Sequence, residues 1–245
     1  MSASLELHND PGIPSGRRAQ RSILIATLDD LSIPHHLAGV ISSVTRSTIK
    51  HLAIIFVSKL FDQPSSTSES QETSISHTRR WSEVQSLLTF VYVQATRVAQ
   101  ELDRVLMEVD VLLKGMDETL PDDFADGVDI LYRVHDGQLS KHVLSNNFIL
   151  KLWQDIMPLL HPLSSIQKVT CLFGDEKIPS TPPISSPPHP DAPPLYPVVV
   201  LGGTFDHLHA GHKILLSMAA WITSEKIIVG VTGAVLFNRA VELFS

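Results

Sequence analysis

The sequence predicts an α/β protein built from two parts. Short apolar runs rich in β-branched residues alternate with segments whose apolar residues recur at helical spacing, which is the pattern of an α/β fold. Nine of the sixteen prolines lie between residues 174 and 197, and such a tract cannot continue a helix or an interior strand. We therefore expect a flexible arm at 1–21, an N-terminal α/β domain at 22–173, a proline-rich linker at 174–196 and a second folded segment at 197–245.

The N-terminal domain is expected to begin with a βαβ unit. Two apolar runs, at 22–28 and 52–58, are typical of strands, and residues 33–50 between them can supply the crossover helix. A Ser- and Thr-rich stretch without apolar periodicity predicts a loop at 62–77, and apolar residues at helical spacing predict a helix at 81–102. The remaining patterns predict strands at 105–113, 128–134 and 169–173, and a helix at 148–160. We find no catalytic signature in this domain.

The second folded segment has the pattern of a further βαβ unit. Residues 197–201 form an apolar run that suits a strand buried on both faces of a parallel sheet, and residues 226–231 form a second such run. Between them, residues 213–221 carry apolar side chains at helical spacing. Gly202 and Gly203 end the first strand, and because they lack a Cβ their main-chain N–H groups can approach a ligand closely.

Three histidines lie between this strand and the helix, at positions 207, 209 and 212. The N-terminus of a helix favours an anion such as a phosphate, because its first N–H groups are unpaired and the helix dipole is positive there. The pattern therefore favours a nucleoside triphosphate attacked at its α-phosphate, with imidazoles and N–H groups stabilising charge on the phosphorus oxygens. A zinc site formed by His207, His209 and His212 is the less favoured alternative, because a metal site needs further ligands and no HExxH pattern is present.

The residues at this helix carry a resemblance to a known family. Residues 203–206, GTFD, followed by residues 209–212, HAGH, resemble the GTFDxxHxGH signature of the nucleotidylyltransferase superfamily. The longer string LGGTFDHLHAGHKILLSMAAW, residues 201–221, most closely resembles the eukaryotic, fungal-type phosphopantetheine adenylyltransferases of coenzyme A biosynthesis. The resemblance implies that residues 197–245 hold the first βαβ unit of a Rossmann-like, cytidylyltransferase-like nucleotidylyltransferase domain.

The resemblance also implies a reaction and a site. The reaction would transfer AMP from ATP, accompanied by Mg²⁺, to 4′-phosphopantetheine, giving dephospho-coenzyme A and pyrophosphate. The implied catalytic residues are His212 and His209, and His212 would stabilise charge at the reacting phosphorus. Asp206 is expected to cap the turn before the helix, and His207 to pack or face solvent. The residues implied to line the nucleotide site are Gly203, Thr204, Phe205, His209 and His212.

The sequence after Thr232 departs from the family pattern. The family continues with a lysine-rich stretch and further strands and helices, whereas here residues 233–245 are mostly apolar and no lysine follows Lys226. We therefore expect a C-terminally truncated chain that lacks the basic groups for the β- and γ-phosphates, unless Arg239 supplies one. Two alternatives remain open: a catalytically inactive product or non-catalytic binding module, and an enzyme that uses CTP or a different phosphorylated acceptor.

The composition excludes several other classes of protein. A net charge of −7 argues against a nucleic-acid partner, because such proteins normally present a basic face. No stretch approaches the roughly 18 consecutive apolar residues of a membrane-spanning helix, so no membrane partner is expected. The start of the chain lacks the plan of a secretory signal, and its one cysteine, Cys171, cannot form an internal disulfide. We expect the protein in the cytoplasm.

Overall fold

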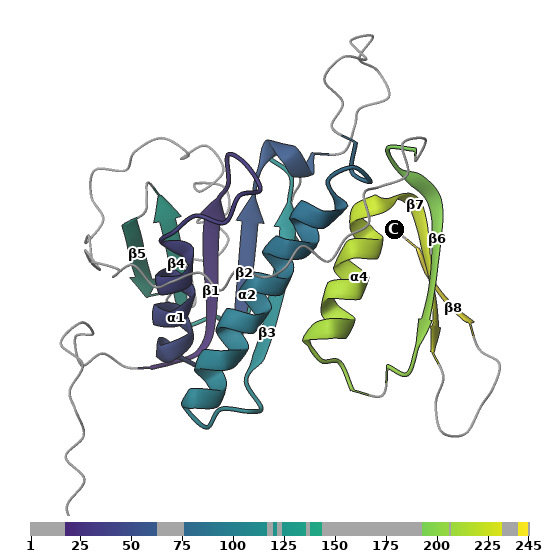
Figure 1. The fold of residues 1–245 in the computed structure, drawn as a ribbon. Coiled ribbons are helices and arrows are strands. Elements are labelled where there is room, and N and C mark those ends of the chain that lie inside the picture. The colour runs from purple at the N-terminus through teal and green to yellow at the C-terminus, as the bar shows by residue number, and fades with distance from the viewer. Residues whose placement is uncertain are drawn as a thin grey trace, which may run out of the picture.

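The computed structural model describes residues 18–62, 76–116, 120–121, 124–135, 138–143, 193–205, 207–231 and 240–244. These residues form two sheets with helices packed on them, so the predicted α/β class is confirmed (Figure 1). The five-stranded sheet, called here the N-terminal sheet, has the order β3-β2-β1-β4-β5, and the three-stranded C-terminal sheet has the order β6-β7-β8. None of the helices in these ranges is long and apolar enough to cross a membrane.

The N-terminal sheet is parallel except at one edge. Strands β1 (Ala19–Thr27), β2 (Thr48–Val57), β3 (Glu108–Lys114) and β4 (Ile130–His135) run in the same direction, and β5 (Gln138–Val143) pairs antiparallel with β4. The predicted first βαβ unit is confirmed, because β1 and β2 pair in parallel around helix α1 (Leu37–Ser47). Central strands of a parallel sheet are covered on both faces, which explains the unbroken apolar runs of β1 and β2.

Two apolar cores lie on the two faces of this sheet. Helix α1 and helix α2 (Trp81–Glu101) cover one face, where Leu24, Ile54 and Phe56 are fully buried. The opposite face carries a smaller core, in which Ile23 and Ile55 pack with residues 124–131. The short 3-10 helix η1 (Lys59–Phe61) follows β2 and adds Phe61 to the helix-covered core.

The predicted start of the third strand is wrong by three residues. Residues 105–107 form the turn that ends α2 instead of the beginning of β3. Asp103 has a φ of 56°, a left-handed conformation typical of a helix C-terminus, and the N–H of Arg104 donates to the carbonyl oxygen of Ala99 at 2.8 Å. As a result Leu106 lies outside the sheet and its side chain is 91% exposed, although its sequence pattern is that of a strand.

The C-terminal sheet contains the second predicted βαβ unit. Strand β6 (Tyr196–Gly203) pairs in parallel with β7 (Thr223–Val231), and helix α4 (Ala210–Ile222) connects them as expected. One expectation is wrong. Strand β6 is the edge of its sheet, with Val200 69% exposed, so it is not buried on both faces. The sheet also has a strand that was not predicted, β8 (Ala240–Phe244), which pairs antiparallel with β7.

Helix α4 lies between the two sheets. It covers β6 and β7 on one side, and on its other side it packs against α2 and β3 of the N-terminal sheet (Figure 1). Met218 and Trp221 of α4 are buried in the same apolar core as α1 and α2. The histidine motif is therefore carried by a helix that both sheets hold in place.

Several expectations lie outside the described residues. These are most of the arm at 1–21, the loop at 63–75, the helix at 148–160, the strand at 169–173 and most of the linker at 174–196. The predicted domain boundaries consequently stay predictions. Asp206, Cys171 and Arg239 also lie outside the described residues.

Candidate functional site

The histidine motif lies where strand β6 ends and helix α4 begins. Gly203 is the last residue of β6, and Thr204 follows it in an exposed position. The aromatic ring of Phe205 lies over Gly203, where an added Cβ would come within 3.3 Å of the ring. A side chain at position 203 would therefore displace Phe205, which explains why this position suits glycine.

His209 is the N-cap residue of helix α4. Its Nδ1 accepts a hydrogen bond from the N–H of Gly211 at 3.1 Å, which satisfies one of the unpaired donors of the first helical turn. Because an amide N–H can only donate, Nδ1 must be unprotonated, and the proton of the neutral ring is on Nε2. The cap thus fixes the tautomer of His209 and presents its Nε2–H as a donor.

His212 uses its Nδ1 as a donor, whereas His209 uses its Nδ1 as an acceptor. Its Nδ1 donates to the carbonyl oxygen of His207 at 3.0 Å, so the Nε2 of the neutral ring carries a lone pair. The ring of His212 stacks on that of His209, with the centroids 3.9 Å apart and the planes at 24°, and Phe205 packs near it at 4.8 Å. Both Nε2 atoms lack a hydrogen-bond partner among the described residues. The pair can therefore offer one donor from His209, and a second when His212 is protonated, to a single anion.

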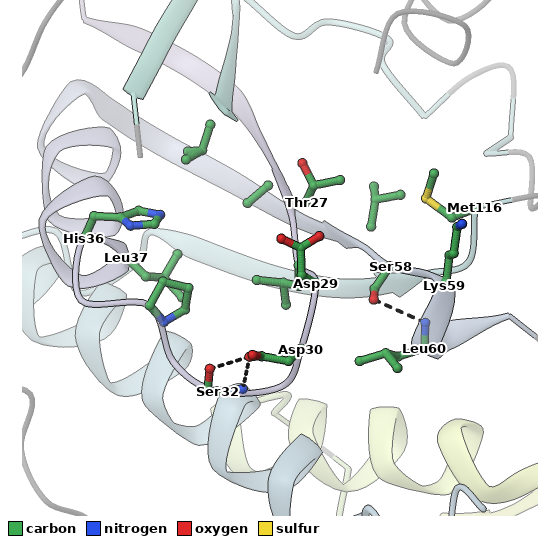
Figure 2. A pocket seen from close by; sticks show the side chains of 15 residues that line it. Thr27, Asp29, Asp30, Ser32, His36, Leu37, Ser58, Lys59, Leu60 and Met116 are labelled. Atoms are coloured by element: carbon green, nitrogen blue, oxygen red, sulfur yellow. Dashed lines mark hydrogen bonds between the residues drawn. The ribbon is translucent and has the colours of Figure 1, made fainter. Parts of the chain in front are cut away.

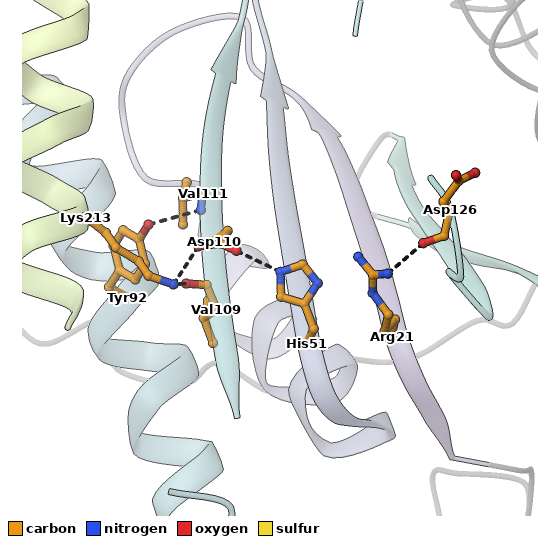
Figure 3. Close-up of polar contacts among 8 residues, drawn as sticks. All are labelled: Arg21, His51, Tyr92, Val109, Asp110, Val111, Asp126 and Lys213. Carbon is orange, nitrogen blue, oxygen red and sulfur yellow. Dashed lines mark hydrogen bonds and ion pairs between the residues drawn. The ribbon is translucent and has the colours of Figure 1, made fainter. Parts of the chain in front are cut away.

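The residue after His212 ties the motif to the N-terminal sheet. Lys213 donates from Nζ to Oδ1 of Asp110 at 2.6 Å and to the carbonyl oxygen of Val109 at 2.8 Å (Figure 3). On the other side of the same carboxylate, Nε2 of His51 lies 2.7 Å from Oδ2. The hydrogen bond with His51 and the contact with Lys213 lower the pKa of Asp110 to about 2, although partial burial opposes the shift. Asp110 is consequently ionised at neutral pH.

Tyr92 fixes the backbone beside Asp110. Its hydroxyl accepts a hydrogen bond from the N–H of Val111 at 3.1 Å, and burial raises the pKa of Tyr92 to about 12 (Figure 3). Helix α2 thereby holds the first residues of β3 where Lys213 of α4 forms its hydrogen bonds. These contacts fix the position of α4 along β3.

The far end of helix α4 is anchored by a reciprocal contact with His77. The indole Nε1 of Trp221 donates to the carbonyl oxygen of His77 at 3.0 Å, and His77 Nδ1 donates to the carbonyl oxygen of Trp221 at 2.7 Å. The two rings stack with centroids 3.8 Å apart, and Phe61 meets the indole edge-on. Burial lowers the pKa of His77, although the hydrogen bond to Trp221 opposes the shift, so the buried site favours the neutral imidazole.

The structure brings together most of the residues expected at the site. Gly203, Phe205, His209 and His212 form one contact group, and Thr204 lies beside it at the end of β6. Their roles toward a nucleotide stay predictions. No group of three or more His, Cys, Asp or Glu suited to a metal ion occurs within the described part of the chain, so the zinc alternative gains no support.

Sequence reasoning missed the residues that position the motif. The contacts of Lys213 with Asp110 and of Trp221 with His77 join residues that are 103 and 144 positions apart. No local pattern signals such a pairing. It also missed a cavity of about 690 Å³ lined by residues after β1 and β2, which includes none of the motif residues.

Comparison with known proteins gives matches over short stretches of the chain. Residues 200–244 match the family model described as Cytidylyltransferase-like. Over 35 residues the chain is 63% identical to the phosphopantetheine adenylyltransferase of Saccharomyces cerevisiae, a stretch that covers 14% of this chain and 12% of that protein. Over 45 residues it is 51% identical to an uncharacterized protein of Schizosaccharomyces pombe, which covers 18% of this chain and 14% of that protein. No solved structure matches. Each stretch is thus a small part of that relative. The match of residues 200–244 to the Cytidylyltransferase-like model supports a nucleotidyltransferase class for this segment.

Proposed function

We propose that the histidine motif binds the triphosphate of ATP and that the protein acts in adenylyl transfer to 4′-phosphopantetheine. The observation that carries the proposal is the pair of stacked imidazoles at the start of α4, each held through Nδ1 so that Nε2 is left for a ligand. Two such groups beside a helix N-terminus suit a phosphate anion. The likeness to the yeast adenylyltransferase supports this acceptor, over the short stretch that it covers.

The reaction in this proposal is a single displacement at phosphorus. A phosphate oxygen of 4′-phosphopantetheine attacks the α-phosphorus of ATP, the bond to the bridging oxygen of the β-phosphate breaks, and pyrophosphate leaves. The products are dephospho-coenzyme A and pyrophosphate, and no covalent enzyme intermediate forms. His209 donates from Nε2 to an oxygen of the triphosphate, and protonated His212 stabilises the charge that grows in the transition state. Gly203, Thr204 and Phe205 line the nucleotide site, with Thr204 near the phosphates.

Magnesium enters this proposal as part of the substrate. The described residues offer no cluster of carboxylates for a resident metal ion. Magnesium prefers phosphate oxygens and water and needs few protein ligands. It would therefore arrive bound to ATP, where it neutralises part of the charge on the phosphates.

The test is pyrophosphate release by the full chain with ATP, Mg²⁺ and 4′-phosphopantetheine. We expect turnover that His212→Ala lowers by about two to three orders of magnitude, since one donor at a developing oxyanion is typically worth that much. His207→Ala is the matched control, because it removes an exposed imidazole two residues before His209 but keeps the backbone carbonyl that orients His212. An unchanged rate in His212→Ala would contradict the proposed role. ATP binding without turnover would support the non-catalytic alternative, and faster turnover with CTP would identify a different nucleotide.

A further inference from the structure

A cavity lies at the carboxyl ends of the parallel strands of the N-terminal sheet (Figure 2). It measures about 690 Å³, and its lining residues come from the ends of β1, β2 and β4 and from the segment after β3. The chain passes from β1 to β2 on one side, whereas β4 lies on the other side of β1. The strand order therefore reverses beside β1, and in open α/β sheets ligands bind outside the carboxyl ends of the strands at such a point.

The segment after β1 repeats the spacing of the histidine motif. Residues 27–31 read TLDDL and residues 204–208 read TFDHL, so Thr, Asp and Leu occupy the same three positions. His35 follows Thr27 by eight residues, just as His212 follows Thr204. Each segment leaves a parallel strand and leads into the helix of a βαβ unit. The two βαβ units thus carry Thr, Asp, Leu and His at the same spacing after their first strands.

The segment after β1 lacks the residues that form the histidine pair of the motif. Ser32 stands at the position of His209, and Pro34 stands at the position of Gly211. The stacked pair of imidazoles cannot form without the second histidine, and proline has no N–H for a histidine cap to bind. The segment after β1 therefore lacks the pair of imidazoles that is proposed to act on the α-phosphate.

The charged residues that line the cavity indicate which class of ligand it can bind. Asp29 and Asp30 supply two carboxylates against one ammonium group, from Lys59, which disfavours a polyphosphate. Two hydrogen bonds from Ser32 hold the pKa of Asp30 below its usual value, so this carboxylate stays ionised. The carboxylate of Asp29 points into the cavity and has no hydrogen-bond partner among the described residues (Figure 2).

These groups match the parts of a small nucleotide. A carboxylate at the carboxyl end of a strand can accept hydrogen bonds from ribose hydroxyl groups, as an acidic residue further along the chain does in dinucleotide-binding folds. A single phosphate can meet Lys59, and the apolar wall can hold a base; that wall comprises Leu28, Leu60, Met116 and Val134. We propose that this cavity is a second, non-catalytic nucleotide site that binds a nucleoside monophosphate.

The proposed site is separate from the histidine motif. Lys213, beside His212, contacts Val109 and Asp110 at the start of β3, whereas the cavity opens at the carboxyl ends of the same strands. A strand of this length spans about 20 Å, so one bound nucleotide cannot reach both places. The two sites can therefore be perturbed one at a time.

The test uses AMP as the probe on the full chain, by isothermal titration calorimetry and by photo-crosslinking with 8-azido-AMP. We expect crosslinks at residues 27–37 or 57–60. Asp29→Asn should weaken binding at this site by about tenfold or more, the loss expected for a hydrogen bond to a charged group. Thr27→Phe should fill the cavity and abolish the crosslink. Asp126→Asn removes an exposed carboxylate that lies just before β4, at the opposite end of the sheet from the cavity; it is the matched control and should bind like the wild type.

Several outcomes would overturn the proposal. Crosslinks confined to residues 203–213, or no binding at millimolar AMP, would place no nucleotide in the cavity. Wild-type affinity in both Asp29→Asn and Thr27→Phe would do the same. His212→Ala should leave the cavity crosslink intact while it lowers pyrophosphate release, so failure of one proposal does not imply failure of the other. Displacement of the label by ATP at lower concentration than by AMP would refute the preference for a monophosphate.

Discussion

The ion pair between Lys213 and Asp110 should contribute measurably to the docking of the motif helix. The pKa of Asp110 is about 2 in the folded protein, against 3.8 for the free side chain. That difference corresponds to roughly 2.4 kcal/mol as an upper limit. The carboxylate is 41% exposed and shares the effect with His51, so solvent screening leaves about 1 kcal/mol for the Lys213 contact.

A double-mutant cycle with Lys213→Met and Asp110→Ala isolates this contact. We expect a coupling of about 1 kcal/mol in the free energy of unfolding, obtained from urea midpoints at unchanged slope. Arg80 and Glu83 form an exposed pair at 3.7 Å and serve as the control, with a coupling of about 0.3 kcal/mol. The folded pKa of Asp110 is depressed, so its stabilisation is fully present above pH 4 and is lost only as the pH falls toward 2. Additive energies, or a coupling that decays between pH 8 and pH 5, would refute this account.

Three further predictions concern the two ends of α4. Gly211→Ala places a Cβ within 3.0 Å of the His209 ring and should displace that ring, so pyrophosphate release should fall about tenfold or more. Thermal stability should change little, because the better helix propensity of alanine offsets the loss of the His209 cap. Trp221→Ala should cost about 3–5 kcal/mol in urea unfolding, against less than about 1 kcal/mol for the half-exposed Leu215→Ala on the same helix. Burial lowers the pKa of His77 below 6.5, so the free energy of unfolding should be highest above that pH and fall as acid protonates the ring. His77→Phe should reduce the change of this free energy between pH 7 and pH 5. An unchanged pH dependence in this variant would contradict the prediction.

The local elements were predictable because each has a local cause. The apolar runs of β1 and β2 and the helical spacing of α2 reflect burial that the sequence itself encodes. The start of β3 was predicted wrongly because Leu106 looks like a strand residue, while the chain at Asp103 turns left-handed to finish α2. Strand β6 was expected inside a sheet for a similar reason. Its apolar run does not reveal that β7 is the one strand that pairs with it in the described part of the chain.

The residues of the candidate site were predictable from the sequence, but the distant residues that position them were not. The spacing of His209 and His212 at a helix start predicted where the two rings lie, and the structure adds how each is held. The capping role of His209 illustrates the limit, because the sequence pattern gave no reason to expect this residue as the N-cap of α4. A short polar side chain is the usual cap, so pattern reasoning passes over an imidazole.

One signal for the docking of α4 was present in the sequence. Residues 214–222 read ILLSMAAWI, so apolar residues surround the helix instead of forming one stripe. A helix that covers a single sheet needs one apolar face, whereas a helix that is apolar all round must be buried on more than one side. Helix α4 meets this requirement by packing on β6 and β7 with one side and on α2 and β3 with the other. Loss of the N-terminal sheet would therefore expose Met218 and Trp221 and release Lys213, so the orientation of the histidine motif depends on a sheet that carries none of its residues.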